Sequence, residues 1–435
     1  MKKIILFAFM LSFASLQAQI DKTKLDQYFD AIEENNKFNG SIAIAEDGKI
    51  IYERSLGFAD LETQKKNNAP TKFRIGSISK TFTAALILKA ADEGRLDIHK
   101  SIENFFPKLK NADKITIQDL LNHHSGIFSI TDDPDYLTWH TKAHSGAEML
   151  DKIYTYEPAF EPGIRGEYSN SNYVLLTLIL ENVYGKSFGE ILNEEIVQPL
   201  GLKNTQFGGK INLKNNEANS YTYQREWVKE SETDMSIPLG AGGIISTPAD
   251  IIKFGEALFA GKIISQKHLE NMKTIKDDYG LGIFEIPFYE KKAYGHTGGI
   301  DGFSSMWGYF PNEKVSFALT SNGSNFNNND IAIAILSSVF GKEFEIPSFA
   351  QNTADVQPGF TGTFSNSQIG MDISVSEKDG KYFAQATGQA PFPLDKTGEF
   401  EFRFEPAGIV MEFANDLKAF TLLQGGGKFL FEKIK

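Results

Sequence analysis

Apolar residues at helical spacing precede two short apolar segments near the start of the chain. The helical set is Leu25, Tyr28, Phe29 and Ile32. Residues three and four apart share one face of a helix, so this set predicts a first helix. The apolar segments 41–45 and 50–52 flank Asp47-Gly48, a dipeptide that favours a two-residue hairpin turn. The pattern predicts a helix packed on an antiparallel sheet.

The most apolar helical pattern lies in residues 77–92. Positions 82–88 are apolar on nearly every side, which is typical of a buried helix, and Gly94 is placed to end it. Three further helices carry start signals: Asn170 or Ser171 before 173–184, a capping box from Ser187 to Glu190, and Thr247-Pro248 before Asp250.

Later segments predict strands and then a second, smaller domain. Residues 303–310 and 315–320 have the composition of adjacent buried strands. Together with the helices before them they predict an α/β architecture. Near the C-terminus the pattern changes to short alternating runs at 371–375, 400–404 and 409–413. Their spacing predicts a small antiparallel β-barrel or sandwich.

The N-terminus and one polar stretch divide the chain. Met1-Lys2-Lys3 precedes the apolar residues 4–11, which is the pattern of a secretory signal too short to span a membrane. We therefore expect cleavage after Ala18 and an exported protein, periplasmic or extracellular. The predicted organisation is a signal peptide (1–18), a main domain (19–345), a polar linker (346–357) and an all-β domain (358–435).

Composition narrows the classes of function. The 435-residue chain has no cysteine and a formal net charge of −12. Disulfide bonds and thiolate catalysis are therefore excluded. The acidic balance disfavours nucleic acids and anionic membrane surfaces, which reward clustered Lys and Arg. We expect a small-molecule or peptide substrate, no nucleic-acid partner, no membrane span after signal removal, and no cofactor.

The first candidate for chemistry is Ser77-Ile78-Ser79-Lys80. Residues three apart on a helix share a face, so Lys80 can reach the Ser77 hydroxyl. At the start of a helix, the dipole and the free N–H groups also favour negative charge. Alone, the pattern is more typical of a capping serine and a solvated lysine. It occurs once in this chain, at the start of the most apolar helix.

The second candidate is Tyr168-Ser169-Asn170, which follows a turn at Pro162-Gly163. A phenol becomes a usable base when a nearby cation stabilises its phenolate, and Lys80 would supply that charge. Asn170 would donate to a substrate amide and contact Lys80, although such a residue by itself is more often a helix cap.

The third candidate is His296-Thr297-Gly298-Gly299, which leads into a predicted strand. Small residues here let a substrate backbone lie along the strand edge. The Gly299 N–H would join the Ser77 N–H to form an oxyanion hole. The alternative for this segment alone is an ordinary glycine turn between strands.

With these three motifs in this order, the chain resembles the family of class C β-lactamases, serine DD-peptidases and related esterases. The motifs match the family's Ser-x-x-Lys, Tyr-x-Asn and Lys/His-Thr-Gly boxes, and the segments 120–126 and 240–247 are similar to it as well. The resemblance covers about residues 25–340. It implies a β-lactamase/transpeptidase-like fold, with a central antiparallel sheet flanked by helices, a helical region, and the site between them. The tail resembles the lipocalin-like barrels appended to some members.

The third box bears on the substrate. A lysine there recognises a carboxylate, whereas His296 is mostly neutral at pH 7. Family members with histidine in this box include peptidases that act on D-amino-acid peptides. We therefore expect an acyl-enzyme hydrolase for D-amino-acid peptides or related amides. The alternatives are a carboxylesterase, a β-lactamase, or a penicillin-binding sensor or scaffold without turnover.

The expected mechanism is acyl transfer. Tyr168, supported by Lys80, takes the Ser77 proton, and Ser77 attacks a carbonyl held by two backbone N–H groups. His296 and Thr297 orient the substrate, and water releases the acyl group.

Several other residues are set aside. Lys396-Thr397-Gly398 is a literal Lys-Thr-Gly, but a β-turn in the tail explains it. His123 and His124 are adjacent, so they cannot form the one-face pair of a zinc helix, and no metal site is predicted. We expect them to order the loop before Ser125-Gly126. The remaining aromatic candidates are interpreted as packing residues: Trp139, Tyr221, Tyr223 and Trp227.

Overall fold

A computed structural model describes residues 20–224, 226–349, 359–367, 369–378, 380–389, 391–425 and 427–435. The predicted signal peptide, residues 1–18, lies outside the described residues, as do residues 350–357 of the predicted linker and Pro358. None of the helices in the described part of the chain has the length and apolarity that crossing a membrane requires.

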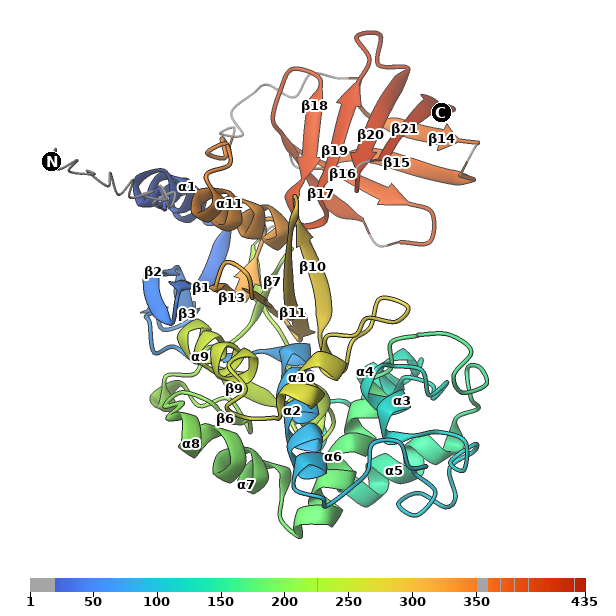
Figure 1. The fold of residues 1–435 in the computed structure, drawn as a ribbon. Helices are drawn as coiled ribbons and strands as arrows, with labels where there is room; N and C mark the ends of the chain where they lie inside the picture. The colour runs from blue at the N-terminus through green and yellow to red at the C-terminus, as the bar shows by residue number, and fades with distance from the viewer. Residues whose placement is uncertain are drawn as a thin grey trace, which may run out of the picture.

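A six-stranded antiparallel sheet forms the centre of the main domain (Figure 1). Its strands, in spatial order, are β10 (Phe284–Phe288), β11 (Lys291–Ile300), β12 (Phe303–Phe310), β13 (Val315–Ser324), β1 (Phe38–Glu46) and β2 (Lys49–Leu56). The predicted hairpin is confirmed, since Asp47 and Gly48 both have positive φ between β1 and β2. The N-terminal hairpin thus completes a sheet whose other strands come from the end of the domain.

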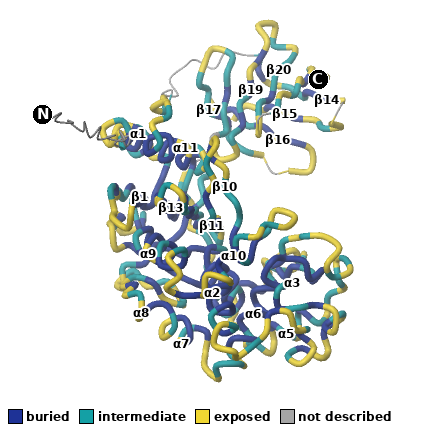
Figure 2. The backbone as a smooth tube through the Cα atoms, in the orientation of Figure 1, coloured by how far each residue is buried: buried dark blue, intermediate teal, exposed yellow. Residues whose placement is uncertain are grey.

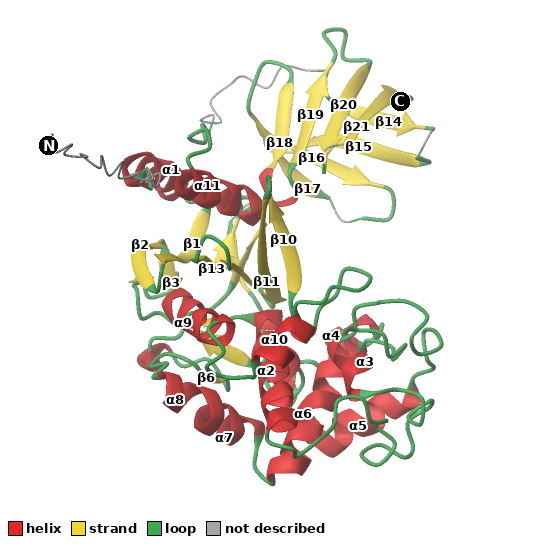
Figure 3. Cartoon of the chain, in the orientation of Figure 1, coloured by secondary structure: helices red, strands yellow, loops and turns green. Residues whose placement is uncertain are grey.

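Two helices cover one face of this sheet, α1 (Lys22–Glu34) and α11 (Asn328–Phe340), which lie side by side (Figures 1 and 3). The four apolar residues that predict the first helix are all buried in α1. They share one core cluster with α11 and with the side chains on this face of the sheet.

The other face of the sheet packs on the larger helical region. Its longer helices are α2 (Ser79–Asp92), α5 (Gly146–Thr155), α6 (Asn170–Tyr184), α9 (Pro248–Phe259) and α10 (Gln266–Met272). Its short helices are α3 (Ile117–Leu121), α4 (Tyr136–Trp139), α7 (Phe188–Leu192) and α8 (Gln198–Leu200), with tighter turns η1 (Gly76–Ile78), η2 (Ile130–Asp132), η4 (Leu213–Asn215) and η5 (Leu239–Ala241) and a π-turn η3 (Asn193–Val197). Figure 2 shows α2 and α6 as buried elements at the centre of this region.

Small antiparallel sheets connect the helical region to the main sheet. They pair β3 (Phe58–Asp60) with β4 (Lys65–Lys66), β9 (Ile244–Ser246) with β5 (Phe73–Arg74) and β6 (Gln206–Phe207), and β7 (Tyr221–Tyr223) with β8 (Trp227–Lys229).

The predicted burial of the helix after Ser77 is confirmed. Every residue from Ser79 to Leu88 is buried. Phe82 stacks on Phe254 of α9 with ring centroids 3.6 Å apart. α9 in turn lies so close to β12 that a Cβ on Gly255 would be 2.1 Å from the Trp307 ring. Close packing of α2, α9 and the sheet therefore fixes where the start of α2 lies.

Two of the predicted helix starts are confirmed and one is not. Ser187 and Glu190 form the capping box, and Thr247 caps α9 with Pro248 at its first position. α6, however, begins at Asn170, directly after Ser169 in the sequence, and has no side-chain cap. The expectation that Asn170 or Ser171 caps a helix beginning at residue 173 is wrong, because both side chains bind other groups.

The C-terminal domain is a closed eight-stranded antiparallel barrel, which confirms the predicted all-β tail. Its strands are β14 (Gly362–Asn366), β15 (Met371–Lys378), β16 (Lys381–Ala386), β17 (Phe392–Lys396), β18 (Glu401–Phe404), β19 (Ile409–Phe413), β20 (Ala419–Gln424) and β21 (Gly427–Lys433), with a tight turn η6 (Glu405–Ala407). β14 closes the barrel by pairing with both β15 and β21. Thr397 and Gly398 both donate backbone N–H groups to the Glu401 carbonyl, so Lys396-Thr397-Gly398 lies at a turn as expected.

The Phe82–Phe254 stack gives a test of this packing. We expect Phe82→Ala to lower the free energy of unfolding by about 3–5 kcal/mol, because it removes a buried ring and leaves a cavity. Urea titration followed by circular dichroism measures this loss. Leu137→Ala is the control, since Leu137 is 76% exposed and its change should be within about 0.5 kcal/mol. Equal losses in the two variants would contradict the packing.

Candidate active site

Ser77 lies in the tight turn η1, two residues before α2 begins. It is partly exposed, whereas Gly76 and Ile78 on either side are buried. Gly76 has a φ of +49°, and a Cβ there would lie 2.7 Å from the Gly299 nitrogen. Only glycine therefore allows the turn to approach β11 so closely. The hydroxyl is presented at the junction of α2 and the sheet.

Lys80 is fully buried beneath Ser77 and has three polar partners. Its Nζ lies 2.9 Å from Ser77 Oγ, 2.7 Å from Asn170 Oδ1 and 2.7 Å from the Ala241 carbonyl oxygen. Burial lowers the pKa of Lys80 well below its ordinary value of 10.5. A neutral amine has two N–H groups and one lone pair. In the neutral form of Lys80, the amide and carbonyl oxygens take the two N–H groups, which leaves the lone pair for the Ser77 hydroxyl proton.

Tyr168 hydrogen-bonds to Ser77, and Lys80 Nζ lies 4.8 Å from the centre of its ring. Burial raises the pKa of Tyr168 above the ordinary 10, and the hydrogen bond with Ser77 offsets this only in part. The pKa shifts of both residues therefore oppose the sequence-based hypothesis of a Tyr168 phenolate stabilised by a Lys80 cation. Burial disfavours both the Tyr168 anion and the Lys80 cation.

Asn170 links the lysine to the wall of the site. Its Oδ1 accepts from Lys80, and its Nδ2 donates to Thr131 Oγ1 at 2.9 Å. Both amide groups are therefore used, and neither caps α6. The amide holds the Lys80 amine in place beside Ser77.

The His296–Gly299 segment lies at an unpaired strand edge. β10 pairs with β11 only as far as Phe284 opposite Gly295, whereas β12 continues to pair up to Ile300. The other edge of this segment is therefore free of β10. It faces the turn that carries Ser77, because a Cβ on Gly298 would lie 3.0 Å from the Ser77 nitrogen.

His296 is 2% exposed and packs against Phe284, with ring centroids 4.4 Å apart. Its Nδ1 lies 2.5 Å from the Thr297 carbonyl oxygen, to which it donates. Burial, with a smaller contribution from Lys80, lowers the pKa of His296 from 6.5 to about 3. The histidine is therefore neutral at physiological pH, so the third motif supplies no cation.

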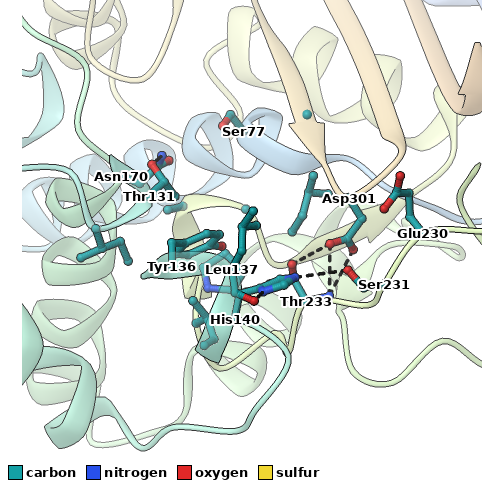
Figure 4. Close-up of a pocket in the computed structure, with 17 residues that line it drawn as sticks. Ser77, Thr131, Tyr136, Leu137, His140, Asn170, Glu230, Ser231, Thr233 and Asp301 are labelled. Carbon is teal, nitrogen blue, oxygen red and sulfur yellow. Dashed lines mark hydrogen bonds between the residues drawn. The ribbon is translucent and has the colours of Figure 1, made fainter. Parts of the chain in front are cut away.

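Ser77, Asn170 and Gly299 border a cavity of about 360 Å³ (Figure 4). The sequence-based prediction did not include several other residues that border this cavity: Thr131, Tyr136, Leu137, His140, Glu230, Ser231, Thr233 and Asp301. Tyr136 and His140 stack with ring centroids 5.5 Å apart. Their spacing of four residues is the local sequence signal that they share a helix face. Trp139, between them in sequence, is buried as expected.

Carboxylates rather than cations line this cavity. Of the described residues that border it, Glu230 and Asp301 are acidic and none is lysine or arginine. Arg74 lies behind Asp301 and is bound by two carboxylates, Asp301 at 2.9 Å and Glu232 at 2.7 Å. Figure 4 shows Asp301 turned toward Thr233, which donates to it through both its backbone and its hydroxyl group. Glu230 accepts from Thr222 Oγ1.

Comparison with known proteins agrees with this geometry. The family model described as Beta-lactamase matches residues 25–339. Penicillin-binding protein 4* of Bacillus subtilis is 25% identical, over 94% of this chain and 98% of that protein. A teichoic acid D-alanine hydrolase of Staphylococcus aureus is 28% identical, over 69% of this chain and 74% of that protein.

Solved structures show the same fold. The D-amino acid amidase of Ochrobactrum anthropi aligns at a TM-score of 0.65 and 26% identity, over 73% of this chain and 99% of that one. A penicillin-binding protein homologue from Pyrococcus abyssi covers 95% of this chain and 100% of its own, with a TM-score of 0.68 and 24% identity. The predicted sheet-and-helix fold and the C-terminal barrel are therefore confirmed.

The opposing pKa shifts of Lys80 and Tyr168 give a pH dependence. If neutral Lys80 is the active form, kcat/KM falls only when acid protonates it, well below pH 10.5. We expect kcat/KM to reach a plateau well below pH 10.5 and to keep it up to about pH 9, since Tyr168 keeps its proton there. A lysine with an ordinary pKa would instead give a rise of roughly tenfold per pH unit up to about pH 10. A steady-state pH profile distinguishes the two, and the continuous rise would contradict a depressed Lys80 pKa.

Proposed function

The chain belongs to the β-lactamase family of serine hydrolases, and we propose that it cleaves amides or esters of D-amino acids through an acyl-enzyme on Ser77. The observation that carries this proposal is the charge of the site. The third motif is neutral, and the described residues that border the cavity include the Glu230 carboxylate and the Arg74-paired Asp301 carboxylate but no lysine or arginine. Such a site disfavours a substrate carboxylate and suits a free amino group.

The relatives support the D-amino acid part of the proposal. Those that the chain resembles include a D-amino acid amidase, a D-stereospecific amidohydrolase from Streptomyces and a teichoic acid D-alanine hydrolase. Each of these three names refers to hydrolysis of a D-amino acid derivative or to D-stereospecific hydrolysis.

In the proposed first step, the Lys80 lone pair takes the Ser77 hydroxyl proton while Oγ attacks the substrate carbonyl carbon. The Ser77 and Gly299 N–H groups stabilise the resulting oxyanion. This assigns the proton acceptor to Lys80 rather than to Tyr168, because burial lowers the one pKa and raises the other.

In the second step, the tetrahedral intermediate collapses and the bond to the amine or alkoxide breaks. The Tyr168 phenol donates its proton to that leaving group, and Lys80 returns the serine proton to Tyr168. Water then attacks the acyl-enzyme by the same route, which releases the acid and restores Ser77.

A covalent adduct tests the nucleophile. A fluorophosphonate should add to the wild-type protein in a 1:1 ratio at Ser77, as intact-mass and peptide mass spectrometry would report. Ser77→Ala should give no adduct and lose at least about 10³-fold in kcat, since removing a nucleophile abolishes the covalent route. A folded wild type without an adduct, or a Ser77→Ala variant of undiminished activity, would overturn the proposal.

A substrate panel tests the specificity. We expect kcat/KM to be highest for D-alanyl p-nitroanilide with a free amino group, lower for its L-isomer and its N-acetyl derivative, and lower still for nitrocefin. Fastest turnover of nitrocefin would indicate a β-lactamase. Equal turnover of simple p-nitrophenyl esters without stereopreference would indicate a carboxylesterase, and binding without turnover a sensor.

Glu230→Gln tests whether the Glu230 carboxylate binds the free amino group of the substrate. It should raise KM about tenfold for the free-amino substrate, because one charged contact is worth about 1.4 kcal/mol or more. The N-acetyl substrate should be unaffected. Glu226→Gln is the matched control, since Glu226 is exposed on the same hairpin and does not border the cavity.

A further inference from the structure

His123 lies directly against Tyr168, on the loop that follows α3, and belongs to none of the three motifs. The two ring centroids are 4.5 Å apart and the ring planes are inclined by 30°. Tyr279 and Tyr173 surround the same imidazole at 5.1 and 5.4 Å. The histidine is 2% exposed. Its ring is therefore part of the buried wall on which the Tyr168 phenol rests.

The polar atoms of His123 bind the residues on both sides of Tyr168. Its carbonyl oxygen accepts from the Glu167 N–H at 2.9 Å. Its Nδ1 accepts from the Ser169 N–H at 3.1 Å. The backbone is thus held immediately before and immediately after Tyr168 by one residue, which also packs on the ring between them.

The surrounding network fixes which ring nitrogen of His123 carries the proton. Ser125 Oγ accepts from the Ile127 N–H and donates its hydroxyl proton to Asn172 Oδ1, at 2.6 Å. The Asn172 amide therefore presents Nδ2 to His123 Nδ1, at 3.3 Å. Two donors facing Nδ1 require a lone pair there. The imidazole must be neutral, with its proton on Nε2.

The electrostatic surroundings support the neutral form. Burial lowers the pKa of His123 well below 6.5, and Lys80, His296 and His124 oppose its protonation further whenever they carry a proton themselves. The other titratable groups against the ring are the three phenols of Tyr168, Tyr173 and Tyr279. A cationic His123 would lose its acceptor atom and would lie near Lys80.

We propose that His123 is a positioning residue for Tyr168, whose neutral imidazole holds the phenol at Ser77 by ring packing and by hydrogen bonds to both flanking residues. The proposal rests on the role of Tyr168 in acyl transfer given above. His123 does not border the cavity, so its loss should lower kcat rather than substrate binding.

Two substitutions separate the ring from the acceptor atom. His123→Phe keeps an aromatic ring and removes Nδ1. His123→Asn keeps an acceptor near the Nδ1 position and suits the backbone, because His123 has a φ of +61° and asparagine tolerates that region. We expect His123→Phe to lower kcat roughly 10- to 100-fold with little change in KM, as for a catalytic group displaced by about 1 Å. His123→Asn should recover a substantial part of this loss.

His124→Phe is the matched control. His124 is equally buried on the same loop, but its ring nitrogens bind the Asn122 carbonyl and Asp277 instead of the Tyr168 segment. Kinetics would be normalised to the active fraction by end-point titration with a fluorophosphonate. An equal fall in kcat for His124→Phe, or an unchanged kcat for His123→Phe, would overturn the proposal. Absence of any wild-type adduct would instead count against Ser77 and the proposed function.

A measurement on the wild type keeps the test decisive if His123→Phe does not fold. In protein labelled with ¹⁵N-histidine, the two-bond correlations of the His123 ring report its tautomer. We expect a protonated Nε2 and a bare Nδ1 at pH 7. A protonated Nδ1 would contradict the network and overturn the proposal.

Discussion

The candidate site depends on one constraint, the burial of the Lys80 amine. Three separate segments meet at this nitrogen: the turn that carries Ser77, the start of α6 through Asn170, and the Ala241 carbonyl of η5. Burying an ammonium ion without a paired carboxylate costs several kcal/mol, and losing a proton removes most of that cost. The same packing that buries α2 therefore favours the neutral amine, whose lone pair is available to the serine hydroxyl. Asn170 and Ala241 set the direction of that lone pair.

Neutrality extends from Lys80 to the groups around it. Burial favours the neutral forms of Tyr168, His296 and His123 as well, because it raises the pKa of the phenol and lowers those of the two imidazoles. The charge that faces a substrate comes instead from the cavity wall, where Glu230 borders the cavity and the Asp301 carboxylate is paired with Arg74. In the proposed function, the residues that react and the residues that select the substrate are thus physically separate. The first belong to the helix–sheet junction and the second to α4 and the 230–233 segment.

Features set by local sequence could be predicted. The buried α2, the hairpin at Asp47-Gly48 and the capping box at Ser187 follow from spacing and turn chemistry within a few residues. The cavity wall could not be predicted, because Tyr136, Glu230 and Asp301 are brought together only by tertiary packing. The predicted roles of a Lys80 cation and a Tyr168 phenolate rest on ordinary pKa values. Burial instead lowers the pKa of Lys80 and raises that of Tyr168, which disfavours both charged forms. Asn170 has the composition of a helix cap, yet its amide is used by Lys80 and Thr131.

The protonation state of Lys80 in the resting protein tests this account most directly. Nζ chemical shifts of protein labelled with ¹³C and ¹⁵N lysine, assigned by comparison with Lys80→Met, can be followed from pH 5 to pH 10. The account predicts that Lys80 loses its proton well below the pH of about 10.4 at which an ordinary lysine titrates. An ammonium signal from Lys80 that persists to pH 9 would contradict it.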